Sequence, residues 1–386
     1  MNRAKKEEEC KRKRETNGAG EQKKRLYKEE EHYNSIQLPT KQGYVRPRYT
    51  ESQIAQYFDR IRLSRPQRIF SVTSLTPAEK LTYLTLLKKH HLVAIPYENI
   101  QAHYSWHKGV SVSPTRLFSK IVDHHRGGWC FELNQFLNTV LLSLGFEAIL
   151  AASRVFEPSN NRYGGLTHCV NIVNISGVQY LLDVGFGGLG PPHPIPLPEE
   201  AENVEAIAPP SYHHLGPRAQ MRVKREVIPQ QISQSRRLWV YEFRADPHQE
   251  WKPMCCFNDD FELLPEDIAI LNTQGMSRTC FVSRELLIQR FTTSSEQLDA
   301  TGLKNIHETI DRELDGSLVL YENRLKWRKG GDLKLNIELK DEVERVGALK
   351  HFFGIDLDEE ECESIVGTVG ELRESWFGAA FNQEKV

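Results

Sequence analysis

One cysteine of this chain stands in a setting that favours nucleophilic chemistry. Cys130 lies in the stretch RGGWCFEL, after Gly127, Gly128 and Trp129, and apolar residues at helical spacing follow it to Leu144. The pattern predicts a tight turn leading into a buried helix, with the cysteine at its N-terminus. A helix N-terminus favours the reactive thiolate, and N–H groups freed by the glycine turn can hold an oxyanion. Buried structural cysteines are commoner, so other residues must support a catalytic role.

A histidine and an aspartate further along are spaced so that a hairpin brings them together. Residues 166–188, LTHCVNIVNISGVQYLLDVGFGG, read as strand, turn and strand. A four-residue loop places His168 directly opposite Asp183, and a loop of only Ser176 and Gly177 places them one diagonal apart. Their Cβ atoms would then be about 5 Å or about 7–8 Å apart, which is within imidazole–carboxylate reach. An aspartate in an apolar strand also needs a partner, since a lone buried carboxylate is costly.

Together the three residues meet the requirements of nucleophilic acyl transfer. In such a triad the aspartate orients the imidazole, the histidine takes the thiol proton, and the cysteine holds the acyl group as a thioester. The alternative is a structural cysteine with a satisfied histidine beside a strand-end aspartate. The sequence predicts Cys130, His168 and Asp183 as the catalytic residues.

The elements that would position this triad change from helical to strand-like along the chain. Apolar residues first recur at helical spacing and then alternate with a period of two, which predicts helices followed by an antiparallel sheet or barrel. We expect six segments: a charged leader (1–46), a helical domain with the cysteine (47–145), a strand-rich domain with the histidine and aspartate (146–263), a connecting region (264–304), a domain of strands and a helix (305–372) and a tail (373–386).

The leader is charge-dense and poor in apolar residues, so we expect it to be disordered. Its basic run from Lys11 to Arg14 could act as a nuclear or surface address. A solvated tail or a misassigned start codon is the favoured interpretation, because the leader has no apolar periodicity.

Composition excludes several classes of partner. The 386 residues carry 50 basic and 52 acidic side chains, a formal net charge of −2, so no strong field attracts nucleic acid or an anionic membrane. No apolar run approaches the roughly 18 residues of a membrane span, and no secretory signal is present. Seven scattered cysteines fit a reducing compartment, so we expect a cytoplasmic protein. No C-x-x-C pair occurs and the histidine doublets point apart on regular elements, so we expect no metal site.

Four blocks of the sequence are similar to those of one enzyme family. IPYENI (95–100), RGGWCFELN (126–134), THCVNIV (167–173) and YLLDVGFG (180–187) resemble the arylamine N-acetyltransferases, including fungal-type members, in order and spacing. The resemblance implies an α+β fold with an N-terminal helical bundle, an antiparallel β-barrel and a C-terminal α/β lid. It implies the same triad and a ping-pong reaction, in which acyl-coenzyme A acylates the cysteine and an arylamine or hydrazine takes the acyl group. The donor would be acetyl-coenzyme A, or malonyl- or propionyl-coenzyme A as in some fungal relatives.

The resemblance also implies roles around the triad. Glu98 and Arg126 would pair behind the nucleophile, next to the two glycines of its turn. Coenzyme A would contact Gly164, Gly165, Thr167 and Ser277, and the aromatic acceptor pocket would be lined by Phe186, Phe131 and Tyr97. A malonyl donor needs a cation near the acyl tail, for which the candidates are Arg154, Arg162, Arg218 and Arg278.

Two other functions remain open at this point. A thiol hydrolase or transglutaminase-like enzyme uses the same triad in the same order, and would cleave or crosslink peptides without coenzyme A. A catalytically silent relative would act as a binding protein, although an intact triad argues against it. We expect no permanently bound cofactor, a monomer, and either xenobiotic or secondary-metabolite amines as substrates. The loops 189–217 and 246–266 look long for the family.

Overall fold

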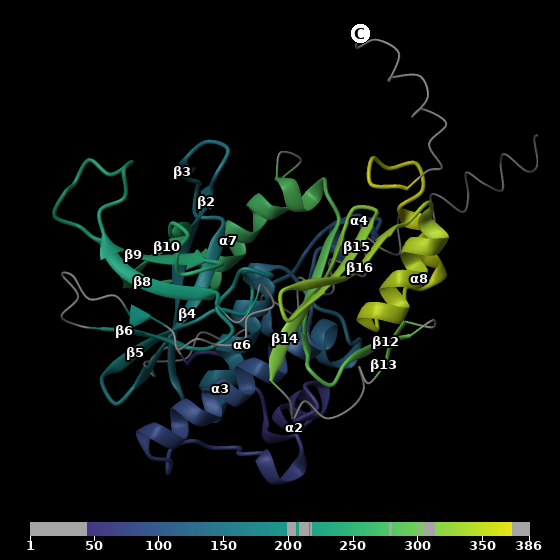
Figure 1. Ribbon diagram of the computed structural model, residues 1–386. Coiled ribbons are helices and arrows are strands. Elements are labelled where there is room, and N and C mark those ends of the chain that lie inside the picture. The colour runs from purple at the N-terminus through teal and green to yellow at the C-terminus, as the bar shows by residue number, and fades with distance from the viewer. Residues whose placement is uncertain are drawn as a thin grey trace, which may run out of the picture. The chain divides into compact units, whose positions relative to one another are not determined.

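The computed structural model describes residues 45–198, 206–207, 216, 218–277, 280–299, 302–304 and 313–372 (Figure 1). Almost all of the leader that is expected to be disordered, the tail 373–386 and much of the loop 189–217 lie outside these residues. Among the described helices, none is both long and apolar enough to cross a membrane.

Helices form the first part of the described chain, as the apolar spacing predicts. Thr76 caps the helix α3 reciprocally: its hydroxyl accepts the N–H of Glu79, and the Glu79 carboxylate accepts the N–H of Thr76. Helix α6 ends at Gly145, whose φ of 90° suits a glycine C-cap. The helical elements are α2 (Glu51–Arg60), η1 (Arg65–Gln67), α3 (Pro77–Ala94), α4 (Ile100–His103), α5 (Pro114–Phe118), the π-helical turn η2 (Ser119–Asp123) and α6 (Cys130–Leu144).

Helix α6 is buried on almost every side. Leu133, Phe136, Val140 and Leu144 belong to one apolar cluster with side chains from α2, α3 and the following strands. Burial of each such side chain contributes about 1.5–3 kcal/mol. The helix that begins at Cys130 is therefore held firmly in the core.

An antiparallel sheet of nine strands follows the helices. Its order is β6-β5-β4-β2-β10-β9-β8-β7, and β3 pairs with β2. The edge strands β6 and β7 lie in contact, so the sheet nearly closes into a barrel. The strands are β2 (Glu147–Glu157), β3 (Arg162–Tyr163), β4 (His168–Ile175), β5 (Val178–Leu182), β6 (Ile195–Leu197), β7 (Ala206–Ile207), β8 (Gln220–Glu226), β9 (Leu238–Arg244) and β10 (Lys252–Glu262).

The β4–β5 hairpin has the shorter of the two predicted loops. Ile175 pairs with Val178, so the loop is Ser176 and Gly177, and both residues have positive φ. A two-residue turn with positive φ at both positions matches the right-handed twist of the two strands that it joins. His168 therefore lies diagonally across from Asp183 instead of directly opposite.

The connecting region predicted for 264–304 contains regular elements. Helix α7 (Pro265–Gly275) begins with Pro265 at its first position and acidic residues in its first turn, and it buries Ile268 and Asn272. The turn η3 (Phe281–Ser283) and strand β11 (Leu287–Thr293) follow. The prediction missed α7 because its apolar face is narrow, although Pro265 and the acidic residues after it are local signals of a helix start.

A second, five-stranded sheet is assembled from distant parts of the chain. Its order is β1-β11-β14-β15-β16, all antiparallel, and one face packs on α8 (Figure 1). Strand β1 comes from the helical region, so the sheet reaches back to the segment before Cys130. The remaining elements are β1 (Tyr97–Glu98), β12 (Gln297–Asp299), β13 (Gly302–Lys304), β14 (Leu314–Tyr321), β15 (Arg324–Lys329), β16 (Asp332–Glu338), α8 (Glu342–Phe353) and α9 (Glu359–Ser364).

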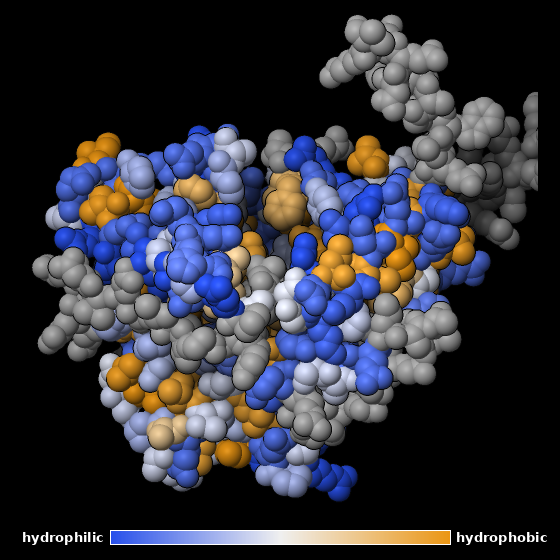
Figure 2. Space-filling view, viewed as in Figure 1, coloured by the Kyte–Doolittle hydropathy of each residue, from blue (hydrophilic) through white to orange (hydrophobic). Residues whose placement is uncertain are grey.

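The face of the molecule in Figure 2 is mostly hydrophilic. Apolar side chains gather over the outer strands of the second sheet, where Leu333 and Ile337 of β16 are exposed. The α+β class and the division into helices, a near-closed barrel and a second sheet with helices agree with the prediction.

Candidate active site

The nucleophile candidate, Cys130, begins α6 after a loop in which Gly127 and Gly128 leave no room for a side chain. A Cβ on Gly127 would lie 1.9 Å from the carbonyl oxygen of Pro96, and one on Gly128 would lie 2.7 Å from a carboxylate oxygen of Glu132. The two glycines thus let the loop pass between β1 and the first turn of α6. Cys130 is half-buried, and its Sγ lies 3.5 Å from the carbonyl oxygen of Thr167.

His168 and Asp183 form a buried pair. The imidazole Nε2 lies 2.8 Å from Oδ2 of the carboxylate, and both side chains are almost fully enclosed. Burial alone would lower the pKa of His168, but the Asp183 charge and hydrogen bonds to Asp183 and Cys130 raise it to about 10. Burial opposes the charge of Asp183 as well, yet the histidine and two further hydrogen bonds lower its pKa.

Those two further hydrogen bonds tie the carboxylate to the nucleophile's helix. Asn134 Nδ2 donates to Asp183 Oδ1 at 2.9 Å, and the N–H of Gly185 donates to the same oxygen at 2.8 Å. Asn134 lies one turn beyond Cys130, so α6 fixes both. The prediction missed Asn134, which is one of several buried polar residues of α6, with Glu132, Gln135 and Asn138.

Gly185 brings the two segments into direct contact. A Cβ there would lie 2.6 Å from Cα of Cys130 and 2.8 Å from Nδ2 of Asn134. Its φ is not positive, so the position needs glycine for space and not for backbone freedom. The aspartate segment can therefore pass directly over the start of α6.

A group of buried charges lies behind the nucleophile. Lys120 Nζ is 2.7 Å from Glu132 and 3.7 Å from Glu98. The Glu98–Arg126 contact implied by the family resemblance is longer, at 4.0 Å. The close partner of Arg126 is Glu361 of α9, at 2.6 Å. Sequence reasoning missed Glu361 because it lies more than 230 positions away from Arg126.

A buried lysine on α3 interacts electrostatically with Asp183. Lys88 donates from Nζ to the carbonyl oxygen of His193 at 3.2 Å. Burial lowers its pKa to about 7, while the charge of Asp183 acts in the opposite direction. Lys88 follows Leu84 by four positions on the buried face of α3, whereas Lys89 beside it is half-buried.

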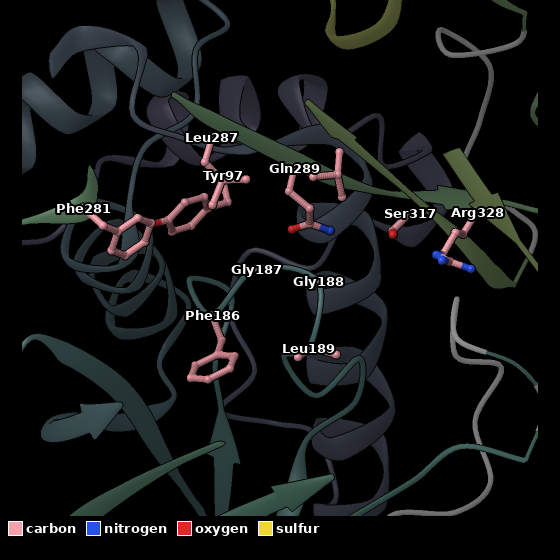
Figure 3. Close-up of a pocket in the computed structure, with 11 residues that line it drawn as sticks. Tyr97, Phe186, Gly187, Gly188, Leu189, Phe281, Leu287, Gln289, Ser317 and Arg328 are labelled. Carbon is pink, nitrogen blue, oxygen red and sulfur yellow. The ribbon is translucent and has the colours of Figure 1, made fainter. Parts of the chain in front are cut away.

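A pocket of about 360 Å³ opens beside the triad (Figure 3). The Phe186 ring, which lines it, packs edge-on against the ring of His168 with 5.4 Å between centroids. Of the other two residues that the resemblance assigns to an acceptor pocket, Tyr97 also lines this pocket, whereas Phe131 is buried in a core cluster with Trp129 and does not. The lining residues are Tyr97, Phe186, Gly187, Gly188, Leu189, Phe281, Leu287, Gln289, Ser317, Val319 and Arg328.

The residues expected to contact coenzyme A lie on two segments. Gly164, Gly165 and Thr167 immediately precede β4, and the Thr167 carbonyl faces the cysteine. Ser277 follows α7, whose Gly275 packs against the Trp129 ring. The Thr167 carbonyl thus lies at Cys130, and Ser277 lies on the separate segment after α7.

Three of the four candidate acyl-tail arginines are described, and none of them lines this pocket. Arg154 donates to the Gly164 carbonyl at 3.1 Å and lines a separate pocket on the barrel. Arg162 pairs with Glu157 and Arg218 with Asp246, while Arg278 lies outside the described residues. The cation that lines the pocket is Arg328 of β15, which the prediction missed.

Comparison with known proteins defines the class of this fold and site. A family model described as N-acetyltransferase matches residues 80–314. The N-malonyltransferase FDB2 of Fusarium pseudograminearum is 30% identical over 342 residues, which cover 83% of this chain and 93% of that protein. These matches define the protein as an acyltransferase.

Solved structures agree on the fold. The arylamine N-acetyltransferase of Mycobacterium abscessus superposes with a TM-score of 0.62 at 21% identity, covering 83% of this chain and 95% of that one. The Mycobacterium marinum enzyme in complex with CoA gives a TM-score of 0.56 at 22% identity, over 83% and 96% of the two chains. The chain belongs to the arylamine N-acetyltransferase family.

Proposed function

We propose that this protein is an acyl-coenzyme A:arylamine N-acyltransferase that works through a thioester on Cys130. The observation that carries the proposal is the buried His168–Asp183 pair next to a half-buried cysteine at a helix N-terminus. A histidine whose pKa is raised to about 10 holds a proton at neutral pH, which fits a thiolate–imidazolium pair.

In the first half-reaction the Cys130 thiolate attacks the thioester carbonyl of the donor. The first N–H groups of α6 have no acceptor within the helix, so they are available to the oxyanion. Collapse of the tetrahedral intermediate breaks the bond to the coenzyme A sulfur, and His168 protonates that sulfur as it leaves. The acyl group then remains on Cys130.

In the second half-reaction an amine attacks the thioester. His168, now neutral, accepts the amine proton, and the Cys130 thiolate leaves as the amide forms. Phe186 and Tyr97 give the pocket flat apolar walls, which suit an aromatic amine. The name of the Fusarium relative makes malonyl-coenzyme A the first donor to compare with acetyl- and propionyl-coenzyme A.

The test is intact-mass spectrometry of the protein mixed with each donor in the absence of amine. We expect an increase by one acyl group, absent in Cys130→Ala and lost from the wild type when aniline is added. No adduct with any donor would contradict the proposal and favour a thiol hydrolase or a silent relative. An adduct that persists in Cys130→Ala would place the acyl group elsewhere.

A further inference from the structure

The pocket beside the triad has two chemically different ends. In Figure 3 the aromatic side chains of Tyr97, Phe281 and Phe186 lie together on one side, and Ser317 and Arg328 lie on the other. The aromatic end adjoins the catalytic histidine through the Phe186 ring. A ligand that fills the pocket therefore extends from the triad towards a polar end.

Gln289 of β11 presents an unpaired donor between these two ends. The residue is only 4% exposed, and its Nε2 has no hydrogen-bond partner among the described residues. In Figure 3 its amide points into the pocket, over Gly187 and Gly188. A buried N–H group left without an acceptor is unfavourable, so an acceptor on a ligand would be favourable at this position.

Arg328 of β15 supplies the charge at the polar end. The one hydrogen bond found for its guanidinium is a long one, 3.5 Å, to the carbonyl oxygen of Gly331 in its own hairpin. The described part of the chain offers it no carboxylate, in contrast to Arg324 on the same strand, which pairs with Glu338. No acidic residue lines the pocket.

We propose that Gln289 and Arg328 form a carboxylate-binding subsite, so that one of the two substrates carries a free carboxylate. A guanidinium and an amide N–H together match the two oxygens of a carboxylate. The carboxylate belongs either to the acyl group, as in a malonyl donor, or to the amine, as in an aminobenzoate. That the ligands are an acyl donor and an amine rests on the proposed function. That the subsite takes a carboxylate rests on the two side chains alone.

The test measures binding, so it does not depend on turnover. In the Cys130→Ala background, calorimetry compares malonyl- with acetyl-coenzyme A, and 4-aminobenzoate with aniline. We expect one carboxylate-bearing ligand to bind better than its neutral counterpart, and Arg328→Gln to reduce that preference about tenfold or more, the usual effect of losing a charged hydrogen bond. Gln289→Leu should reduce the same preference to a smaller extent, and Arg328→Lys should restore part of it.

Lys326→Gln is the matched control. Lys326 is an exposed cation on the same strand, removal of its charge changes the net charge equally, and it does not line the pocket. Its substitution should leave both preferences unchanged. If Arg328→Gln removes the preference for malonyl- over acetyl-coenzyme A, the carboxylate belongs to the acyl group. If it removes the preference for 4-aminobenzoate over aniline, the carboxylate belongs to the amine.

Two results would overturn the subsite. One is that Cys130→Ala protein with Gln289 and Arg328 intact binds neither carboxylate ligand better than its neutral counterpart. The other is a preference that Arg328→Gln leaves intact or that Lys326→Gln reduces equally. Failure of the proposed function would show instead as a missing acyl-enzyme in the mass experiment, whatever the binding preferences are.

Discussion

At the scale of single residues, the site depends on keeping a buried charge pair charged. Burial raises the pKa of Asp183 and lowers that of His168, so each alone would become neutral. Their mutual contact reverses both effects, with Asn134 and the Gly185 N–H holding the second carboxylate oxygen. The same contacts that prepare the histidine for chemistry therefore contribute to folding stability.

This linkage predicts a pH-dependent effect of Asp183→Asn on stability. The raised pKa of His168 contributes stability that is complete below its ordinary value of 6.5 and is lost as the pH rises through about 10. The lowered pKa of Asp183 contributes stability that is present above its ordinary value of 3.8 and is lost as the pH falls further. The free energy of unfolding of the wild type should thus exceed that of the variant most between pH 4 and 6.5.

Urea unfolding of both proteins at a series of pH values measures this difference. Above pH 6.5 the difference in unfolding free energy between wild type and variant should decrease, by at most about 1.4 kcal/mol per pH unit for one proton. A difference in unfolding free energy that stays constant from pH 6 to 10 would contradict the charged pair.

At the scale of elements, the close packing of the aspartate segment on α6 leads to a second prediction. Gly185→Ala forces a Cβ to within 2.6 Å of the Cys130 backbone, which cannot rotate away. We expect a loss of about 1–3 kcal/mol of stability, as for overpacked cores. The displaced nucleophile should also acylate about a hundredfold more slowly, because catalytic geometry tolerates little displacement. Thermal unfolding and single-turnover acylation by malonyl- or acetyl-coenzyme A measure the two effects.

Gly347→Ala in α8 is the control for this substitution. A Cβ at that position meets no atom within 4 Å. Alanine in a helix interior is favoured over glycine by about 0.5–1 kcal/mol, so stability should rise and acylation should not change. Equal losses in both variants would mean that alanine at Gly185 acts without steric contact with Cys130.

Much of this local structure follows from the sequence, and the exceptions share a cause. Periodicity predicted α3, α6 and the β4–β5 hairpin, because their apolar patterns and turn residues are local. Hairpin register alone predicted that His168 lies within reach of Asp183. Asn134, Gln289 and Arg328 were missed because their importance arises only where α6, β11 and β15 meet other elements. Sequence spacing carries no information about such contacts.

At the scale of the whole molecule, the C-terminal segment supports the loop before the nucleophile. Glu361 Oε1 of α9 accepts a hydrogen bond from Arg126 Nη1 at 2.6 Å, and its Oε2 accepts the Asp358 N–H at the start of α9. Arg126 is largely buried, and Gly127 follows it directly. One carboxylate thus joins the last described helix to the turn that positions Cys130.

The last prediction concerns that contact. Glu361→Gln keeps an oxygen for the Asp358 N–H but removes the charge nearest to Arg126, leaving the buried guanidinium with the charges of Glu98, 4.0 Å away, and Glu132. We expect a loss of about 1–3 kcal/mol of stability, the usual effect of removing one partner of a charged hydrogen bond. Glu360→Gln, on the same helix but exposed and without an ion pair among the described residues, should change stability little. Chemical unfolding of both variants measures the difference. Equal stability of the two variants would mean that the C-terminal segment does not support the nucleophile's turn through this contact.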